Sequence, residues 1–213
     1  MSLIELMQAK VKDESGRLTF ADDFAPAVEA ALLKYSQHKP RELVKDVPGA
    51  GTRDVVLPGE WVAEFSQVRR VEYPAGGVPE TLLEGWRVYQ APAGPVLRLA
   101  TEEPTAAELV RVTITVPRLE EEIVVGDVDA VACLAASICC DTLANLFAST
   151  NDPTIMADVV NYRSKSGDYA RRAKDLRNLF GARLGLDGDG GPPAAITTAP
   201  PPTKADGLTH WRS

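Results

Sequence analysis

Residues 128–147 read VDAVACLAASICCDTLANLF, and this stretch decides the fold. Apolar side chains recur at helical spacing through Val131, Leu134, Ile138 and Leu146, and alanines fill much of the remaining circumference. An apolar stripe this wide does not suit a helix on the protein surface, so the segment predicts a helix that is buried on most sides. The other elements of the chain must therefore cover it.

Two helices are predicted on the N-terminal side. Residues 3–11 carry a short apolar stripe, and a longer stripe runs over residues 24–35. Thr19 with Asp22 is a plausible capping box for the longer helix, Pro26 fits its first turn, and the helix should end before Pro40. We expect Leu32 and Tyr35 of this helix to be buried against Leu134, Ile138 and Leu146.

A further helix is predicted from about Ser164 to Gly181 or Gly185. Tyr169, Ala173, Leu176 and Phe180 keep helical spacing, and basic residues occupy the opposite side. The basic residues of interest are Arg171, Arg172, Lys174 and Arg177. Two interpretations are open: a solvated helix face, or a surface that contacts an acidic neighbour, including another copy of the chain.

Residues 41–118 have a β-strand texture. Short β-branched or aromatic runs alternate with Pro- and Gly-rich turns, which favours an antiparallel meander or a small sandwich. The runs are 55–57, 68–73, 86–89, 96–99 and 109–116. The third and fourth runs, 86–89 and 96–99, flank Pro92-Ala93-Gly94-Pro95 and are expected to form a hairpin across that turn. In the last run, Val110, Val112, Ile114 and Val116 should face inward and Arg111, Thr113 and Thr115 outward.

The predicted fold class is therefore α+β: a bundle of three to four helices with a β-rich antiparallel insertion and an extended C-terminal tail. The expected parts are N-terminal helices over 1–40, the insertion over 41–118, C-terminal helices over 119–185, and a tail over 186–213. The tail is rich in Pro and Gly and has no apolar periodicity, so we expect it to be extended or disordered in the free chain. Its final residues His210, Trp211 and Arg212 are candidates for docking onto a partner, with Trp211 as the anchor.

Composition excludes several function classes. The 213 residues include 23 basic and 30 acidic ones, giving a net charge of −7, which is the wrong sign for a protein that grips nucleic acid through its phosphates. The sequence lacks a basic N-terminal region followed by an apolar stretch, and no run of about 18 apolar residues occurs. We therefore expect no secretory signal, no membrane segment and an origin in the cytoplasm.

Residues able to perform chemistry are sparse. Cys139 and Cys140 lie in the predicted buried helix, with Cys133 nearby, and read as small core residues. His38, in a predicted loop, and His210 have no partners at metal-ligand spacing. Asp187-Gly-Asp189-Gly starts like a calcium loop but has Thr198 at the twelfth position, so that motif fails. We expect no cofactor, no metal and no enzymatic activity.

Three strings of sequence resemble a known family. They are Ala30–Arg41 (AALLKYSQHKPR), residues 152–155 (DPTI), and residues 161–166 (NYRSKS) leading into 169–174 (YARRAK). With the order of elements, they resemble the head-to-tail adaptor (connector) proteins of tailed bacteriophages over about residues 1–184. The strings are packing and junction motifs, and carry no catalytic signature.

The resemblance implies a structural protein of the virion neck, made in the bacterial host cytoplasm. It implies a dodecameric ring of identical chains that binds the portal protein and a downstream tail or neck protein. Double-stranded DNA would pass through its channel without sequence-specific binding, during genome retention and ejection. The alternatives are a tail-completion or stopper protein of the same neck, which would more typically be dominated by a β-barrel, and a cytosolic small-molecule-binding module.

Overall fold

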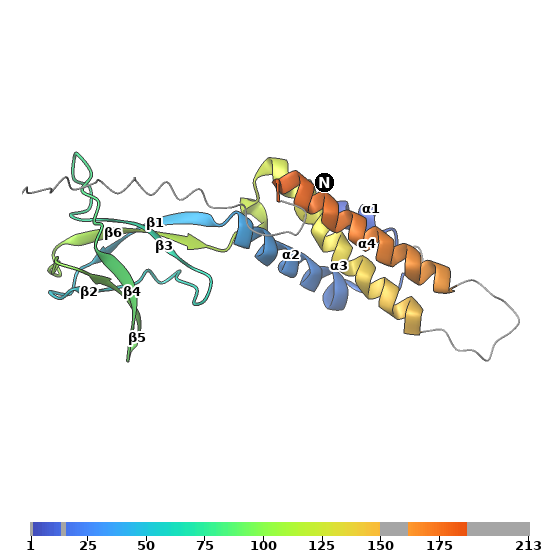
Figure 1. The fold of residues 1–213 in the computed structure, drawn as a ribbon, viewed down its shortest axis with the longest axis horizontal. Helices are drawn as coiled ribbons and strands as arrows, with labels where there is room; N and C mark the ends of the chain where they lie inside the picture. The colour runs from blue at the N-terminus through green and yellow to red at the C-terminus, as the bar shows by residue number, and fades with distance from the viewer. Residues whose placement is uncertain (1, 14–15, 150–161, 187–213) are drawn as a thin grey trace, which may run out of the picture.

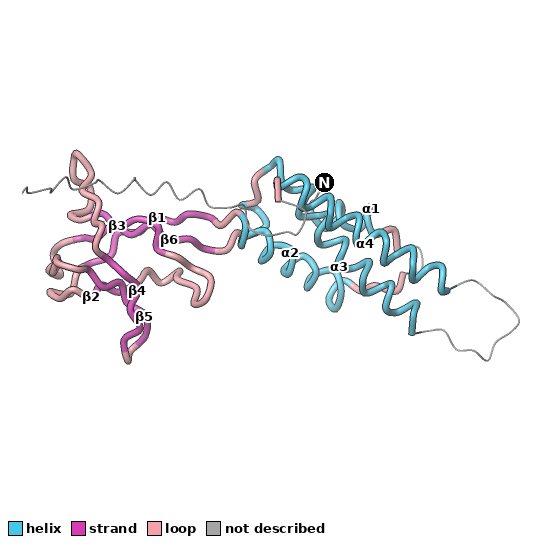
Figure 2. Tube along the Cα trace, in the orientation of Figure 1, coloured by secondary structure: helices cyan, strands magenta, loops and turns pink. Residues whose placement is uncertain are grey.

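The computed structural model describes residues 2–13, 16–149 and 162–186, and their elements form the two ends of an elongated molecule (Figure 1). Helices occupy one end and strands occupy the other, as Figure 2 shows. The helical segments are α1 (Leu3–Val11), η1 (Phe20–Phe24), α2 (Ala25–His38), η2 (Glu120–Glu122), η3 (Val125–Asp127), α3 (Val128–Ser149) and α4 (Tyr162–Leu184). The strands are β1 (Arg41–Pro48), β2 (Asp54–Val56), β3 (Val68–Glu72), β4 (Trp86–Ala91), β5 (Gly94–Leu99) and β6 (Leu109–Val116). The fold is α+β, as predicted.

The first helices begin at side-chain caps. The Ser2 hydroxyl accepts from the Glu5 N–H and the Glu5 carboxylate accepts from the Ser2 N–H, which starts α1. The Thr19 hydroxyl accepts from the Asp22 N–H, which starts the π-helical turn η1 that continues into α2. Helix α2 ends at His38, before Pro40, as predicted.

One hydrophobic core surrounds α3, which packs against α1, α2 and α4. Leu134 and Tyr35 are buried in this core, as predicted, and Leu32 and Ile138 are partly buried against it. The prediction for Leu146 is wrong, because this side chain is 37% exposed. The core side of the last turns of α3 is occupied instead by fully buried Leu143 and, four residues later, by Phe147.

The apolar composition of α3 reflects its position inside this core. By length and composition alone the segment Val125–Ser149 could cross a membrane, with a mean hydropathy of 1.7 in its most apolar window. However, 72% of that window is buried inside the protein. The segment therefore has the character of a core helix.

The strands form two three-stranded antiparallel sheets, in the orders β1-β6-β3 and β2-β5-β4. This is not a meander, because β6, the last strand in the chain, lies between the first and the third. The predicted hairpin is confirmed: Ala91 pairs with Gly94 across a two-residue turn, and Gly94 has a φ of 127°, which favours glycine. The sequence did not single out β1, in which charged residues interrupt the apolar ones, yet β1 pairs with the whole of β6.

The central strand β6 is buried on both faces from Val112 to Val116. Val110, Val112 and Ile114 are fully buried, as predicted. Thr113 and Thr115, predicted to face outward, are buried too. A neighbouring loop causes this difference at Thr115, whose hydroxyl accepts from the Gln67 N–H at 2.8 Å while its own N–H donates to the Gln67 carbonyl at 2.9 Å.

The strands have a hydrophobic core of their own, separate from the helical core. Its buried members come from β2, β3, β5 and β6 and the loop after β2. They are Val55, Leu57, Val71, Leu97, Leu99, Val110, Val112, Ile114 and Val116. Each end of the molecule thus has the apolar burial that stabilises it.

The Arg118 guanidinium holds the two ends together where the chain crosses between them. Its Nε donates to the Lys39 carbonyl at 2.7 Å, Nη1 to the Glu122 carbonyl at 2.9 Å, and Nη2 to the Pro40 carbonyl at 3.3 Å. The Arg118 N–H donates to the Ser36 hydroxyl at 3.0 Å. The end of α2, the start of β1 and the return from β6 are therefore joined by one planar group.

A buried carboxylate stabilises the same junction. Asp127 accepts from the Tyr35 hydroxyl and from the Lys39 ammonium, each at 2.8 Å. Burial alone would raise the pKa of Asp127. The hydrogen bonds from Lys39 and Tyr35, with the charges of Lys39 and Arg118, outweigh burial and hold that pKa below its usual value.

Candidate interaction surface

All four basic residues singled out in the sequence lie on α4. This helix packs on α3 through Ala173, Leu176 and Phe180, which are buried as predicted, while Tyr169 is partly buried. The helix ends at Leu184, and Gly185 follows with a φ of 67°, a left-handed conformation that suits glycine at a helix end. The apolar residues therefore fix which side of α4 faces solvent.

The four basic side chains divide into two pairs. Arg171 is 73% exposed, and within the described part of the chain it pairs only with Asp168, one turn earlier on the same helix, at 2.7 Å. Lys174 is exposed and makes no ion pair with any residue that the structure describes. Both are directed to the surface and are available to a partner.

The other pair fastens α4 to its own bundle. Arg172 donates to the Val11 carbonyl, at the end of α1, at 3.2 Å. Arg177 binds both carboxylate oxygens of Asp141 on α3, at 2.9 and 3.2 Å. These two residues join helices within the chain. The sequence pattern alone could not distinguish them from Arg171 and Lys174, because the contacts that distinguish them are made with other helices.

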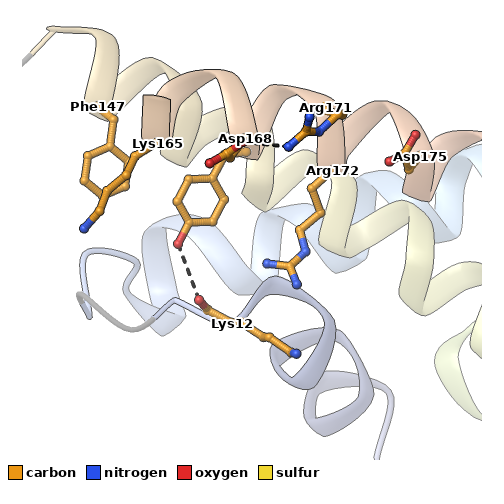
Figure 3. Close-up of a pocket in the computed structure, with 8 residues that line it drawn as sticks. Lys12, Phe147, Lys165, Asp168, Arg171, Arg172 and Asp175 are labelled. Carbon is orange, nitrogen blue, oxygen red and sulfur yellow. Dashed lines mark hydrogen bonds and ion pairs between the residues drawn. The ribbon is translucent and has the colours of Figure 1, made fainter. Parts of the chain in front are cut away.

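A hollow of about 540 Å³ lies beside the N-terminal half of α4 (Figure 3). Four cationic side chains line it with two acidic ones, Asp168 and Asp175. The cations are Lys12, Lys165, Arg171 and Arg172. An excess of positive charge in a concave surface favours the approach of carboxylates.

Stacked aromatic rings form one wall of the hollow. The rings of Phe147 and Tyr169 lie 5.6 Å apart and 3° from parallel. The Arg17 guanidinium lies 4.4 Å from the Phe147 centroid, and the Lys165 ammonium lies 5.7 Å from it. The Tyr169 hydroxyl donates to the Lys12 carbonyl at 3.4 Å, which joins this wall to the end of α1. Lys12 and Arg17 lie far from α4 in the sequence, and no sequence pattern indicated either residue.

The surroundings of the cysteines and of His38, which the sequence analysis considered for chemistry, suit structural roles. Burial raises the pKa of Cys139 to about 12 and that of Cys140 to about 11, so both thiols stay protonated at neutral pH. His38 is the last residue of α2, not a loop residue, and its ring meets Phe180 edge-on at 6.3 Å. Among residues 2–13, 16–149 and 162–186, no three His, Cys, Asp or Glu side chains gather as metal ligands would.

The predicted tail anchors His210, Trp211 and Arg212 lie outside the described residues, as do residues 152–155 and Asn161 of the resemblance. Leu186, which the sequence assigns to the tail, is described and buried in the helical core. Its N–H donates to the Gly181 carbonyl at 2.9 Å. The helical part therefore extends to residue 186.

Comparisons with known proteins find similar chains among the solved structures. No protein-family model matches the chain, and no curated protein matches it. Two of the similar solved structures are the virion of a native gene transfer agent particle (17% identity, 79% of this chain and 88% of the other) and the neck of the native particle computed with C12 symmetry (18%, 77% and 87%). Another is the neck of an empty particle computed with C6 symmetry (16%, 79% and 88%). The TM-score is 0.29 in each case, which is too low to assign a function.

Proposed function

We propose that this chain is a structural protein of the neck of a tailed phage or phage-like particle, where copies of it form an adaptor ring between the portal and the tail. The observation that supports this function best is that the molecule has two separate hydrophobic cores, one at each end, and that the hydrogen bonds of Arg118 join the two ends. An elongated chain can present one end to one partner and the other end to the next. The resemblance of its sequence to head-to-tail adaptors assigns those partners as the portal protein and a downstream tail or neck protein.

The charge of the chain suits a channel for DNA. With a net charge of −7, the protein has little tendency to neutralise phosphates, so duplex DNA can pass without being held. The basic residues are concentrated on α4, where Arg171 and Lys174 are exposed. We assign these two residues to contacts between proteins and not to contacts with DNA.

We also assign portal binding to the C-terminal tail, residues 187–213. Fully extended, a segment of this length reaches roughly 90 Å at about 3.3 Å per residue, enough to cross from one ring to the next. An extended segment can add to the edge of a partner's sheet or lie in its groove, with an aromatic side chain filling a pocket. Trp211, flanked by His210 and Arg212, is that side chain.

Electron microscopy of purified particles tests the proposed location. We expect a ring of this chain between portal and tail, and particles without tails when the gene is deleted. Particles that contain the chain elsewhere, or that assemble normally without it, would overturn the proposal.

Deleting residues 187–213 tests the tail separately. The truncation should begin at 187 because Leu186 belongs to the core. We expect an unchanged melting temperature and loss of attachment to portal-containing heads, and Trp211→Ala should weaken attachment in the full-length chain. Full occupancy of heads by the truncated protein would remove the tail from the proposal.

A further inference from the structure

The outer side of η1 and α2 combines acidic and apolar side chains. Exposed residues recur there at helical spacing, and Phe20 lies beside them. We call this set the acidic face, which consists of Phe20, Asp22, Pro26, Glu29 and Leu33. Phe20 is 59% exposed and Leu33 is 51% exposed. Large apolar side chains beside carboxylates are the composition of a surface that another protein covers.

The outer side of α4 has the complementary composition. Exposed residues recur at helical spacing here as well, and Leu179 lies beside them. We call this set the basic face, which consists of Arg171, Lys174, Asn178, Leu179 and Ala182. Leu179 is 45% exposed. Two acidic residues, Asp168 and Asp175, lie on the same side of the helix and also line the hollow of Figure 3. Four cationic side chains line the same hollow, so that, with Lys174, this surface has an excess of positive charge.

The two faces point away from each other. Helix α3 packs against both α2 and α4, and Figure 1 shows α2 and α4 on opposite sides of it. One molecule therefore cannot bring its own acidic and basic faces together, although a second copy can.

We infer that the acidic face of one copy docks on the basic face of the next copy, with Glu29 opposite Lys174. This inference rests on the proposed function and identifies the faces that would join neighbours in the ring. Because the two surfaces differ, the contact is heterologous and each copy has both halves of it, so it closes into a ring when the rotation between neighbours allows. A two-fold contact of basic face on basic face would oppose like charges, and so would acidic face on acidic face.

The dimensions of the two faces agree with this contact. The segment Phe20–His38 is roughly 28 Å long and α4 is roughly 35 Å long at about 1.5 Å per residue, so the helices can pack side by side over most of their length. With Glu29 opposite Lys174 and the two helices parallel, Leu33 would lie opposite Leu179, because each leucine follows its charged residue by four or five positions, about 6–7.5 Å at 1.5 Å per residue. Burial of these side chains supplies affinity, and the charges select the orientation.

Charge reversal in a homo-oligomer gives a sharp test. Glu29→Lys opposes two basic faces and Lys174→Glu opposes two acidic ones, so each variant alone should self-associate about tenfold or more weakly than the wild type. An equimolar mixture of the two variants should recover, because each altered face then meets the altered face of the other variant. Copies must alternate in that mixture, so its closed rings should contain only even numbers of subunits.

Matched controls carry the same changes of charge away from both faces. Glu84→Lys and Arg87→Glu alter exposed residues of the strand end by the same two units, and both should associate like the wild type. Masses are measured by sedimentation velocity up to the solubility limit, and zero-length cross-linking followed by mass spectrometry should join Glu29 to Lys174. A wild-type chain that stays monomeric without this cross-link, or variants that fail to recover when mixed, would overturn the inference.

The result is separable from that of the proposed function. If the mixture of variants recovers but the protein is absent from necks, the contact is supported and the proposed neck function is refuted. If the protein forms a ring in necks and neither charge reversal affects assembly of that ring, the neck function is supported and this contact is refuted.

Discussion

Replacing Leu143 by alanine tests how α3 is placed, because the same helix provides a matched control three residues later. Leu143 is fully buried, whereas Leu146 is 37% exposed. The two substitutions delete the same atoms from the same kind of backbone, so helix propensity cancels between them. The difference in stability then reports burial alone.

The expected magnitudes differ about threefold or more. Removing a fully buried leucine side chain leaves a cavity in addition to the lost transfer free energy, so Leu143→Ala should lower the free energy of unfolding by about 3–5 kcal/mol. Leu146 is already partly in water, and its replacement should cost about 1 kcal/mol. For a chain of this size, these costs correspond to decreases in melting temperature of about 6–20 °C and about 2–4 °C.

The helical signal in far-ultraviolet circular dichroism is the right assay, because the helices and strands have separate cores and can unfold separately. Equal decreases in melting temperature for the two variants would refute the placement of α3. A larger decrease for Leu146→Ala would support the sequence-based expectation that this residue is buried.

Three other substitutions test the junction and the strand end. Arg118→Lys keeps the charge but loses the planar guanidinium that donates to three carbonyls, so the free energy of unfolding measured by urea titration should decrease by about 2 kcal/mol. An unchanged free energy of unfolding would contradict the role of Arg118 in joining the two ends. Because the pKa of Asp127 is lowered in the folded state, its stabilising effect is present above the unfolded pKa and is lost as the pH falls below about 4. Asp127→Asn should therefore flatten stability against pH in that range, and an unchanged profile would count against the network. Gly49→Ala would place a Cβ 2.1 Å from the Pro104 carbonyl oxygen and should destabilise the chain by about 1–3 kcal/mol, while Gly59→Ala, with open space around it, should not.

The helical part was largely predictable because helical periodicity reports burial directly. The wide stripe of residues 128–147 identified the core helix, and Pro40 and Gly185 marked helix ends. Leu146 was misplaced because a stripe that covers most of a helix does not show which side has a covering neighbour. That information comes from packing, which here leaves one side of the last turn of α3 open to solvent.

The strand part was less predictable because sheet order and loop contacts are not local. The alternation in β6 predicted one buried face, yet its position at the centre of a sheet and the loop at Gln67 also bury Thr113 and Thr115. The charges of β1 hid a strand whose partner lies more than sixty residues away in the sequence. Alternation identifies a strand, but only the tertiary fold decides whether its second face meets solvent.

The basic residues of α4 show the same limit at the candidate site, and the structure changes how that site should be tested. Arg172 and Arg177 bind Val11 and Asp141 within the chain, so reversing their charge would disturb helix packing and would not report on a partner. Arg171 and Lys174 are exposed and take no part in those internal contacts, so reversing their charge leaves the contacts of Arg172 and Arg177 intact. A loss of assembly caused by Arg171→Glu or Lys174→Glu, with an unchanged melting temperature, can therefore be assigned to a lost protein contact. Arg171 and Lys174 are therefore the substitutions that best separate a solvated face from an interface.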